Sequence, residues 1–266
     1  MLSHPLLPKL KALRLSGMAD SLQERAELAR EEGLTPVEFL ALLLDDELDR
    51  RQRKRFARME KMAGFEDVKL LSSFDFSATP SLNKALVLQM ATCAFIERRE
   101  NWLICGPTGV GKSHLATAIG YEAIRRGFTV CSYGVHRLLA DLHASRADGA
   151  LQKWMHRLMT CDLLILDDFG LRPVNPQGAD DLYEIIHCRY ERASTILTSN
   201  RSPAEWPDVF GDALLASAAL DRLTHHARVT VITGESYRQI SRRKERHDPP
   251  ATISTTSDSA SLSNGS

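Results

Sequence analysis

The sequence lacks several features that would assign it to a special class of protein. Its 266 residues carry 34 Lys and Arg against 34 Asp and Glu, so no excess charge favours a nucleic acid or a membrane surface as partner. Its most apolar stretch, residues 85–96, is too short to span a bilayer. The N-terminal residues lack the continuous apolar segment of a signal peptide. With 43% hydrophobic and 26% charged residues, we expect a globular cytoplasmic protein without a membrane partner.

The chain also lacks a recognisable cysteine or metal motif. Its five cysteines are odd in number, form no C-x-x-C pair and lie in apolar segments, so we expect buried, reduced thiols: Cys93, Cys105, Cys131, Cys161 and Cys188. His225 and His226 are adjacent in a predicted helix over about 213–226. Neighbouring helical residues point in different directions, so we expect them to be poor joint metal ligands.

The first 70 residues show only helical patterns. Apolar residues recur at helical spacing, and Thr35, Pro36 and Glu38 form the sequence of a capped helix start. The helix that begins there should run to about Ala63 and end at Gly64. We therefore predict a small all-helical N-terminal domain over residues 1–70, suited to binding DNA or a partner protein.

Strands and helices alternate after residue 100. A connector and one apolar helix to about Glu100 fill residues 71–100. The predicted strands cover 102–105, 129–133, 163–168, 194–200 and 228–232. Such alternation predicts an α/β core over 101–245 with a parallel, doubly wound, five-stranded sheet. The Ser- and Thr-rich tail, residues 246–266, should be disordered.

The strongest motif follows the first predicted strand and opens a helix. It matches G-x-x-x-x-G-K-[ST] at every fixed position: Gly106, Pro107, Thr108, Gly109, Val110, Gly111, Lys112 and Ser113. Backbone N–H groups of such a loop wrap phosphates, aided by the helix N-terminus. Lys112 should reach the β- and γ-phosphates of ATP, and the Ser113 hydroxyl should help to hold Mg²⁺.

Polar residues close two later strands. Asp167 and Asp168 follow the apolar run 163–166, where Asp167 would bind Mg²⁺ and Asp168 would polarise an attacking water. Asn200 closes the next strand and could hold that water or sense the γ-phosphate. Arg222 and Arg238 lie further along the chain and have no role that their position alone assigns.

Taken in order, the segments GPTGVGKSHLA, LLILDDFG, LTSN, ALDRL and GESYR resemble AAA+ ATPases of the helicase-loader clade. Within that clade the chain resembles the IstB-type helper ATPases of bacterial insertion sequences, over roughly residues 1–245. The resemblance implies that Asn200 is sensor 1, Arg222 an arginine finger that reaches a neighbouring subunit's γ-phosphate, and Arg238 sensor 2. An ATP site shared in this way implies a DNA-bound homo-oligomer.

Two features depart from the usual AAA+ pattern. Many members have Asp-Glu where this chain has Asp167-Asp168, and the shorter side chain predicts slow or DNA-dependent hydrolysis. No separate helical lid fits after Arg238, which suits the loader clade and weakens the sensor role of that arginine.

A basic segment breaks the overall neutrality. Seven basic residues lie between positions 50 and 61, interrupted by one acid: Arg50, Arg51, Arg53, Lys54, Arg55, Arg58 and Lys61. We expect them to contact the phosphate backbone of double-stranded DNA without sequence preference, with a solvated charged helix as the alternative. Phe74 and Phe76 could pack near the adenine or could anchor the core.

The sequence therefore predicts an ATP-dependent regulator that assembles on target DNA and recruits or stimulates a separate transposase. A replicative helicase loader would share the same ATPase motifs, so the core cannot separate the two. A nucleotide-gated DNA-binding scaffold with little turnover also stays open because of Asp168. A small-molecule kinase is disfavoured by Asn200 and the two downstream arginines.

Overall fold

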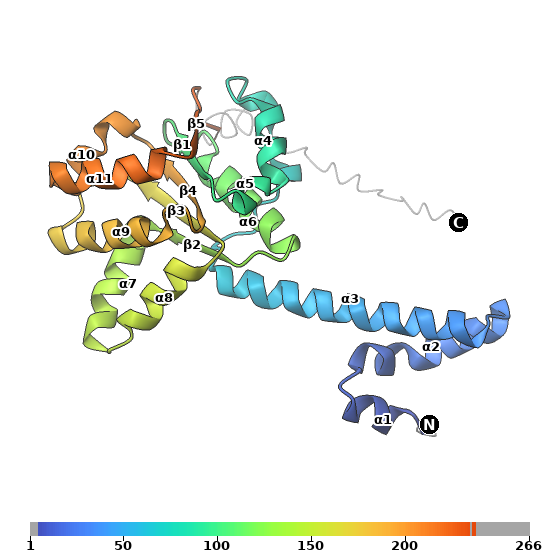
Figure 1. The fold of residues 1–266 in the computed structure, drawn as a ribbon. Helices are drawn as coiled ribbons and strands as arrows, with labels where there is room; N and C mark the ends of the chain where they lie inside the picture. Colours follow the sequence, from blue (N-terminus) through green and yellow to red (C-terminus); the bar gives the residue numbers. More distant parts are fainter. Residues whose placement is uncertain (1–4, 235, 238–266) are drawn as a thin grey trace, which may run out of the picture.

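Three helices precede the sheet in the computed structural model, which describes residues 5–234, 236 and 237 (Figure 1). They are α1 (Leu7–Ala12), α2 (Ser16–Glu32) and α3 (Pro36–Ala63). The predicted start of α3 is confirmed: the Thr35 hydroxyl accepts from the Glu38 N–H, and the Glu38 carboxylate accepts from the Thr35 N–H. The predicted end is confirmed as well, because Gly64 adopts the left-handed conformation that stops a helix. Arg238 and the predicted disordered tail lie outside the described residues.

Helices α2 and α3 pack closely at Gly17. Gly17 lies inside the first turn of α2. Its N–H donates to the buried Glu47 carboxylate at 2.5 Å, and a Cβ on Gly17 would lie 2.6 Å from the Glu47 Cα. Met18, Leu22 and Leu43 form a small core between these two helices. Glycine is therefore required at position 17 by the close approach of α3.

The C-terminal part of α3 belongs to the core of the molecule. Phe56, Met59 and Ala63 join the hydrophobic cluster on one face of the sheet, whereas the N-terminal part of α3 extends away from the sheet toward α2 (Figure 1). At 28 residues, α3 is one continuous helix that connects the N-terminal helices to the core.

The sheet has five strands: β1 (Asn101–Cys105), β2 (Val130–Gly134), β3 (Leu163–Phe169), β4 (Ser194–Ser199) and β5 (Ala227–Val231). Their spatial order is β2-β3-β4-β1-β5, and every neighbouring pair is parallel. The predicted α/β fold with a parallel five-stranded sheet is confirmed. Strand β4 separates β1, which leads into the glycine-rich loop, from β3, which carries the two aspartates.

Helices cover both faces of the sheet, as a doubly wound fold requires (Figure 1). On one face, Leu163 and Ile165 pack in a cluster with α4 (Lys84–Ala91), α5 (Ala94–Glu97) and α6 (Lys112–Arg125). On the other, Leu164 and Leu166 pack with α7 (Val135–Ala147), α8 (Leu151–Thr160), α9 (Pro176–Arg189), α10 (Pro207–Phe210) and α11 (Ala213–Thr224). The near-continuous apolar run of β3 reflects burial on both sides.

One predicted element is wrong. The single helix expected to reach about Glu100 is two helices, α4 and α5, separated at Thr92 and Cys93. The Thr92 hydroxyl donates to the Gln89 carbonyl at 2.7 Å, and Cys93 has a left-handed backbone with φ 62°. The connector before α4 contains two short 3-10 turns, η1 (Leu71–Ser73) and η2 (Phe76–Ala78), and a third, η3 (Pro203–Glu205), precedes α10.

The five cysteines are free, as predicted, and only Cys188 is less than fully buried. The fold brings Cys131 and Cys161 into the same hydrophobic cluster although 30 positions separate them in the sequence. Across the part of the chain that the structure describes, we find no helix both long and apolar enough to cross a membrane.

Candidate nucleotide-binding site

The glycine-rich loop connects β1 to α6. Gly111 caps the helix with φ 94°, a conformation that side chains rarely adopt. A Cβ there would lie 2.7 Å from Cε2 of Phe74, so the ring of Phe74 rests directly against the loop. The loop therefore keeps its backbone N–H groups at the N-terminus of a 14-residue helix, where the helix dipole favours anions.

The ammonium group of Lys112 is held inside this loop. The side chain is buried, and its Nζ donates to the Pro107 carbonyl at 2.8 Å. Burial lowers the pKa of Lys112 from its ordinary value, whereas the carboxylates of Asp168 and Asp167 oppose that shift. The loop thus keeps one cation beside two acids, in a position to meet phosphate oxygens.

Ser113 and Asp167 lie side by side at the end of the sheet. The Ser113 Oγ donates to Asp167 Oδ1 at 2.9 Å. Two neighbouring ligands of an octahedral Mg²⁺ ion, each about 2.05 Å from the metal, lie about 2.9 Å apart. The hydroxyl and carboxylate oxygens therefore fit the donor set and the spacing that Mg²⁺ prefers.

Thr198 is a site residue that the sequence reading missed. It lies on β4, between the strands that carry the loop and the acids. Its hydroxyl donates to Asp167 and accepts from the N–H of Asp168 at 3.1 Å. The side chain is fully buried on β4, and a threonine near the end of a predicted strand was the available signal. Thr198 therefore orients both aspartates.

Asp168 leaves the regular strand geometry. Its backbone is left-handed, with φ 56°, and the pairing of β3 with β4 shifts register between Leu166 and Phe169. The irregularity exposes Asp168 at a cavity of about 290 Å³, which residues 108–114 of the phosphate loop and early α6 also line. Asp167 is half-buried and does not line this cavity. The two adjacent acids thus occupy different positions, one beside Ser113 and one at the cavity.

The connector before α4 forms another wall of this cavity. Phe74 lines the cavity, and its ring meets those of Phe76 and His114 edge-on, at centroid distances of 4.9 and 5.3 Å. Phe76 packs under the Lys84 ammonium and does not line the cavity. His114, which the motif reading passed over, has its Nε2 3.0 Å from the Leu70 carbonyl. Packing of Phe74 beside the adenine of ATP remains a prediction. Phe76 instead packs as an anchor of the core, away from the cavity.

The remaining candidates lie apart from the cavity. Asn200 is exposed directly after β4, at the same edge of the sheet as the loop. Arg222 lies on α11, where its Nη1 donates to the Ala218 carbonyl at 2.7 Å and its guanidinium lies 5.5 Å from the centre of the Tyr183 ring. It does not line the cavity of its own subunit. Arg238 lies outside the described residues.

The basic segment lies on α3, but its members differ in their partners. Arg50 forms an ion pair with Asp20, and Arg51 pairs with Glu47 at 2.7 Å. Arg53 donates to the Asp49 carbonyl at 3.4 Å, and Arg55 to the Gly127 carbonyl at 3.2 Å. Within the described residues, no carboxylate lies within 4.0 Å of three exposed members: Lys54, Arg58 and Lys61.

Comparison with known proteins assigns the family. The family model described as IstB-like ATP binding protein matches residues 8–245. The chain belongs to this family. The IstB-like chain is 40% identical over 239 residues to the "Insertion sequence IS21 putative ATP-binding protein" of Pseudomonas aeruginosa, which covers 90% of this chain and 89% of that protein.

Solved structures confirm the AAA+ fold of this IstB-like protein. The crystal structure of DnaI matches with a TM-score of 0.54 and 22% identity, over 62% of this chain and 91% of that chain. AMPPCP-bound DnaA from Aquifex aeolicus matches with a TM-score of 0.52 and 22% identity, over 67% of this chain and 55% of that chain. The predicted IstB-type family assignment is therefore confirmed.

Proposed function

We propose that this IstB-like protein is an ATP-dependent helper of transposition that assembles on double-stranded target DNA and recruits or stimulates a separate transposase. The observation that carries the proposal is the pairing of Ser113 with Asp167 beside the glycine-rich loop, in a chain whose relatives are insertion-sequence ATP-binding proteins. The first feature suits nucleotide chemistry, and the second suggests the process that the nucleotide controls.

Each site residue has a proposed role toward ATP. The backbone N–H groups of residues 108–111 and the Lys112 ammonium would bind the β- and γ-phosphates. Ser113 and Asp167 would hold Mg²⁺, which supplies charge neutralisation at the phosphates when bound. Asp168, at the cavity, would polarise the attacking water, and Asn200 would hold it in place. Because aspartate is short, we expect ATP turnover to be slow until DNA binds.

A homo-oligomer would complete the site. Arg222 lies on α11, away from the cavity of its own chain, and is held there against Tyr183. An arginine in this position can act only if it faces the nucleotide of a neighbouring subunit. We propose that α11 meets the cavity face of the next subunit, so that repeated contacts build an assembly along DNA.

The DNA would lie along α3. Lys54, Arg58 and Lys61 recur at helical spacing, are exposed, and point cations toward solvent without a carboxylate partner among the described residues. Such a stripe favours phosphate contacts, which carry no sequence information. An oligomer would repeat the stripe along the duplex and multiply its effect.

A strand-transfer assay with the cognate transposase tests the proposal. Wild-type protein with ATP should stimulate strand transfer, and duplex DNA should raise its ATP turnover. Lys112→Ala should lose both effects because the phosphates lose their buried cation. Lys153→Ala, which removes an exposed lysine of α8, is the matched control and should behave as wild type.

Two results would contradict the proposal. Absence of stimulation, combined with binding to a replicative helicase, would make the protein a helicase loader instead. Full ATP turnover by a DNA-free monomer would remove both the shared site and the dependence on DNA.

A further inference from the structure

A second group of potential metal ligands lies at the opposite edge of the sheet from the nucleotide cavity. Glu191 precedes β4, whereas His225 and His226 precede β5. The His226 carbonyl accepts from the N–H of Asn101, the first residue of β1. Because all the strands are parallel, these residues gather at the start of three neighbouring strands, β4, β1 and β5, and the phosphate loop follows the end of β1. The two sites are therefore separate.

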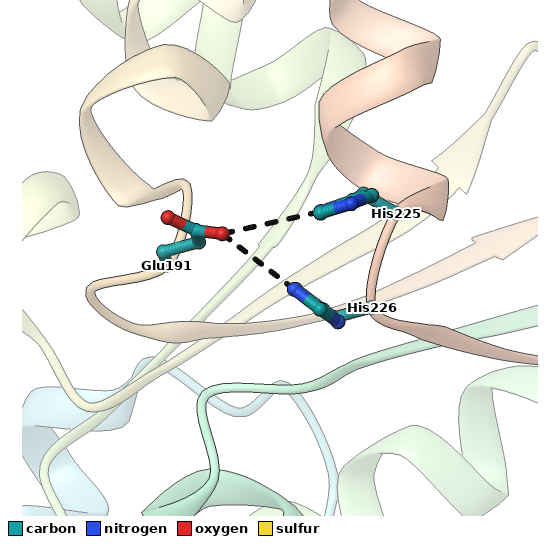
Figure 2. A group of neighbouring side chains, drawn as sticks. All are labelled: Glu191, His225 and His226. Carbon is teal, nitrogen blue, oxygen red and sulfur yellow. Dashed lines mark ion pairs between the residues drawn. The ribbon is translucent and has the colours of Figure 1, made fainter.

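The expectation that the two histidines diverge is wrong. It assumed a helix through position 226, but α11 ends at Thr224 and the chain turns toward β5. The two imidazole rings consequently lie together, with centroids 4.1 Å apart, and both face the Glu191 carboxylate (Figure 2). The two adjacent histidines can face one common partner here because α11 ends before them.

The spacing suits a small metal ion. Glu191 Oε1 lies 3.5 Å from His226 Nε2 and 4.0 Å from His225 Nδ1 (Figure 2). One ligand atom from each residue lies within 4.8 Å of the others. Ligands of tetrahedral Zn²⁺, bound at about 2.0–2.2 Å, lie about 3.3–3.6 Å apart. The three side chains are each about half exposed, with side-chain exposures of 50%, 54% and 55%, so small rotations can close the remaining difference.

Backbone and neighbouring groups hold the cluster in place. Glu191 has a left-handed backbone with φ 57°, and its carbonyl accepts from Arg99 Nη1 at 3.1 Å. The Tyr190 hydroxyl lies 2.8 Å from His225 Nδ1, which adds an oxygen beside the same site. The turn after α9 and the turn after α11 are thus joined through side chains even without a metal.

We propose that Glu191, His225 and His226 bind one divalent transition metal ion, for which Zn²⁺ is the best match. Two imidazoles with one carboxylate are typical zinc donors, whereas Mg²⁺ and Ca²⁺ prefer oxygen alone. Water or the Tyr190 hydroxyl can supply the fourth ligand. The inference depends only on this cluster and is independent of the proposed role in transposition.

The bound ion would join the ends of α9 and α11. These helices pack against each other, and Arg222 of α11 lies over Tyr183 of α9. A metal that links Glu191 to the two histidines would restrain this helix pair three residues after Arg222. Metal binding should therefore raise the melting temperature of the whole chain, because only the folded state brings the three ligands together.

The test is a Zn²⁺ titration of the full chain against a chromophoric chelator, in excess Mg²⁺ and after metal removal. Wild type should bind one Zn²⁺ ion per chain with a rise in melting temperature. Glu191→Gln and His226→Ala should each weaken this binding at least about tenfold, because even supporting residues of metal sites cost 10- to 100-fold. His156→Ala, which alters an exposed histidine of α8, is the control and should keep wild-type affinity.

Unchanged affinity in both ligand variants would overturn the proposal and would place the ion elsewhere, for example on a thiol. Absence of stoichiometric binding to wild type would overturn it too. Circular dichroism and the metal-free melting temperature of each variant show that it is folded, which the exposure of these side chains leads us to expect.

Discussion

Gly17 shows how a single residue sets the distance between two helices. It has no side chain, so the backbone of α2 reaches α3, and its N–H donates to the buried carboxylate of Glu47. Glu47 in turn accepts from Arg51, and the buried acid therefore has two donors. One glycine thus permits both the contact and the burial of a charge.

Replacement of Gly17 by alanine should destabilise the N-terminal helices. The new Cβ would lie 2.6 Å from the Glu47 Cα and 2.8 Å from the Asp46 carbonyl oxygen, so the helices must separate. We expect a loss of about 1–3 kcal/mol in the free energy of unfolding, typical of overpacking. Urea unfolding and hydrogen exchange of α2 measure it.

Gly134→Ala provides the matched control. Gly134 has an ordinary φ of −67°, and nothing lies within 4 Å of the position of a Cβ. The stability of the Gly134→Ala variant should therefore stay close to that of wild type. Equal stabilities of the two variants would show that the close approach at Gly17 is without cost.

At this scale the sequence predicted the groups that the structure gathers at the candidate nucleotide site, but it missed the residues that hold them in place. Lys112, Ser113 and Asp167 follow from motifs with fixed spacing. Thr198 is joined to Asp167 through a neighbouring strand, and His114 to the Leu70 carbonyl across the connector. Such contacts depend on strand order and packing, which no local pattern encodes.

At the scale of elements, α3 combines two environments in one helix. Its first half packs on α2, where Arg50 and Arg51 are used in ion pairs with Asp20 and Glu47. Its second half packs on the core through Phe56 and Met59 and leaves the intervening cations exposed. The basic segment is therefore partly structural, which its uniform sequence does not reveal.

Reversal of charge at Lys54 and Arg58 should weaken DNA binding at every sequence tested. Each residue is exposed, and the two lie four positions apart on one helical face. If both contact phosphates, the slope of log affinity against log salt should fall by about 1.8 in magnitude. Fluorescence anisotropy on two unrelated duplexes, over a range of salt, measures both effects.

Lys153→Glu with Arg192→Glu is the control for that experiment. It makes the same change in net charge at exposed residues outside α3 and should leave most of the affinity. Equal losses of DNA affinity in the two double variants would show that the effect comes from net charge alone. Such a result would contradict α3 as the DNA contact.

The elements themselves were largely predictable because burial follows the sequence pattern. Both ends of α3 carry capping signals, and β3 is apolar because helices cover both its faces. The errors lie at backbone features with no such signal. Cys93 interrupts an apolar helical pattern by a left-handed residue, and the end of α11 at Thr224 reverses the expected divergence of His225 and His226.

At the scale of the whole molecule, the candidate ATP cavity and Arg222 lie on different parts of the core. The cavity is lined by the phosphate loop and the connector, whereas Arg222 belongs to the α9–α11 pair. If Arg222 acts on a neighbouring subunit as proposed, each subunit would be incomplete by itself. The two halves could then be inactivated separately.

A mixing experiment with two inactive variants should restore activity. Lys112→Ala would lack the proposed phosphate-binding cation and Arg222→Ala the proposed finger, so each alone should lose most of its DNA-stimulated ATP turnover. In an equal mixture, one interface in four joins an intact Lys112 to an intact Arg222. We therefore expect about a quarter of the wild-type rate if such interfaces form at random and act independently.

A mixture of Lys112→Ala with the double variant Lys112→Ala, Arg222→Ala should show no recovery, since it contains no intact cavity. If the first mixture also stays inactive, Arg222 does not act between subunits.

The length of α3 has a mechanical consequence. Its core end is coupled to the helix that starts at the phosphate loop, because Phe65 stacks on Tyr121 at 4.6 Å and the Tyr121 hydroxyl donates to Glu60 at 3.0 Å. A helix of 28 residues measures about 42 Å, so a tilt of about 10° at its base would move its far end by about 7 Å. The helix would thus act as a lever arm, converting a small rotation beside the nucleotide into a displacement of two base-pair steps at its tip.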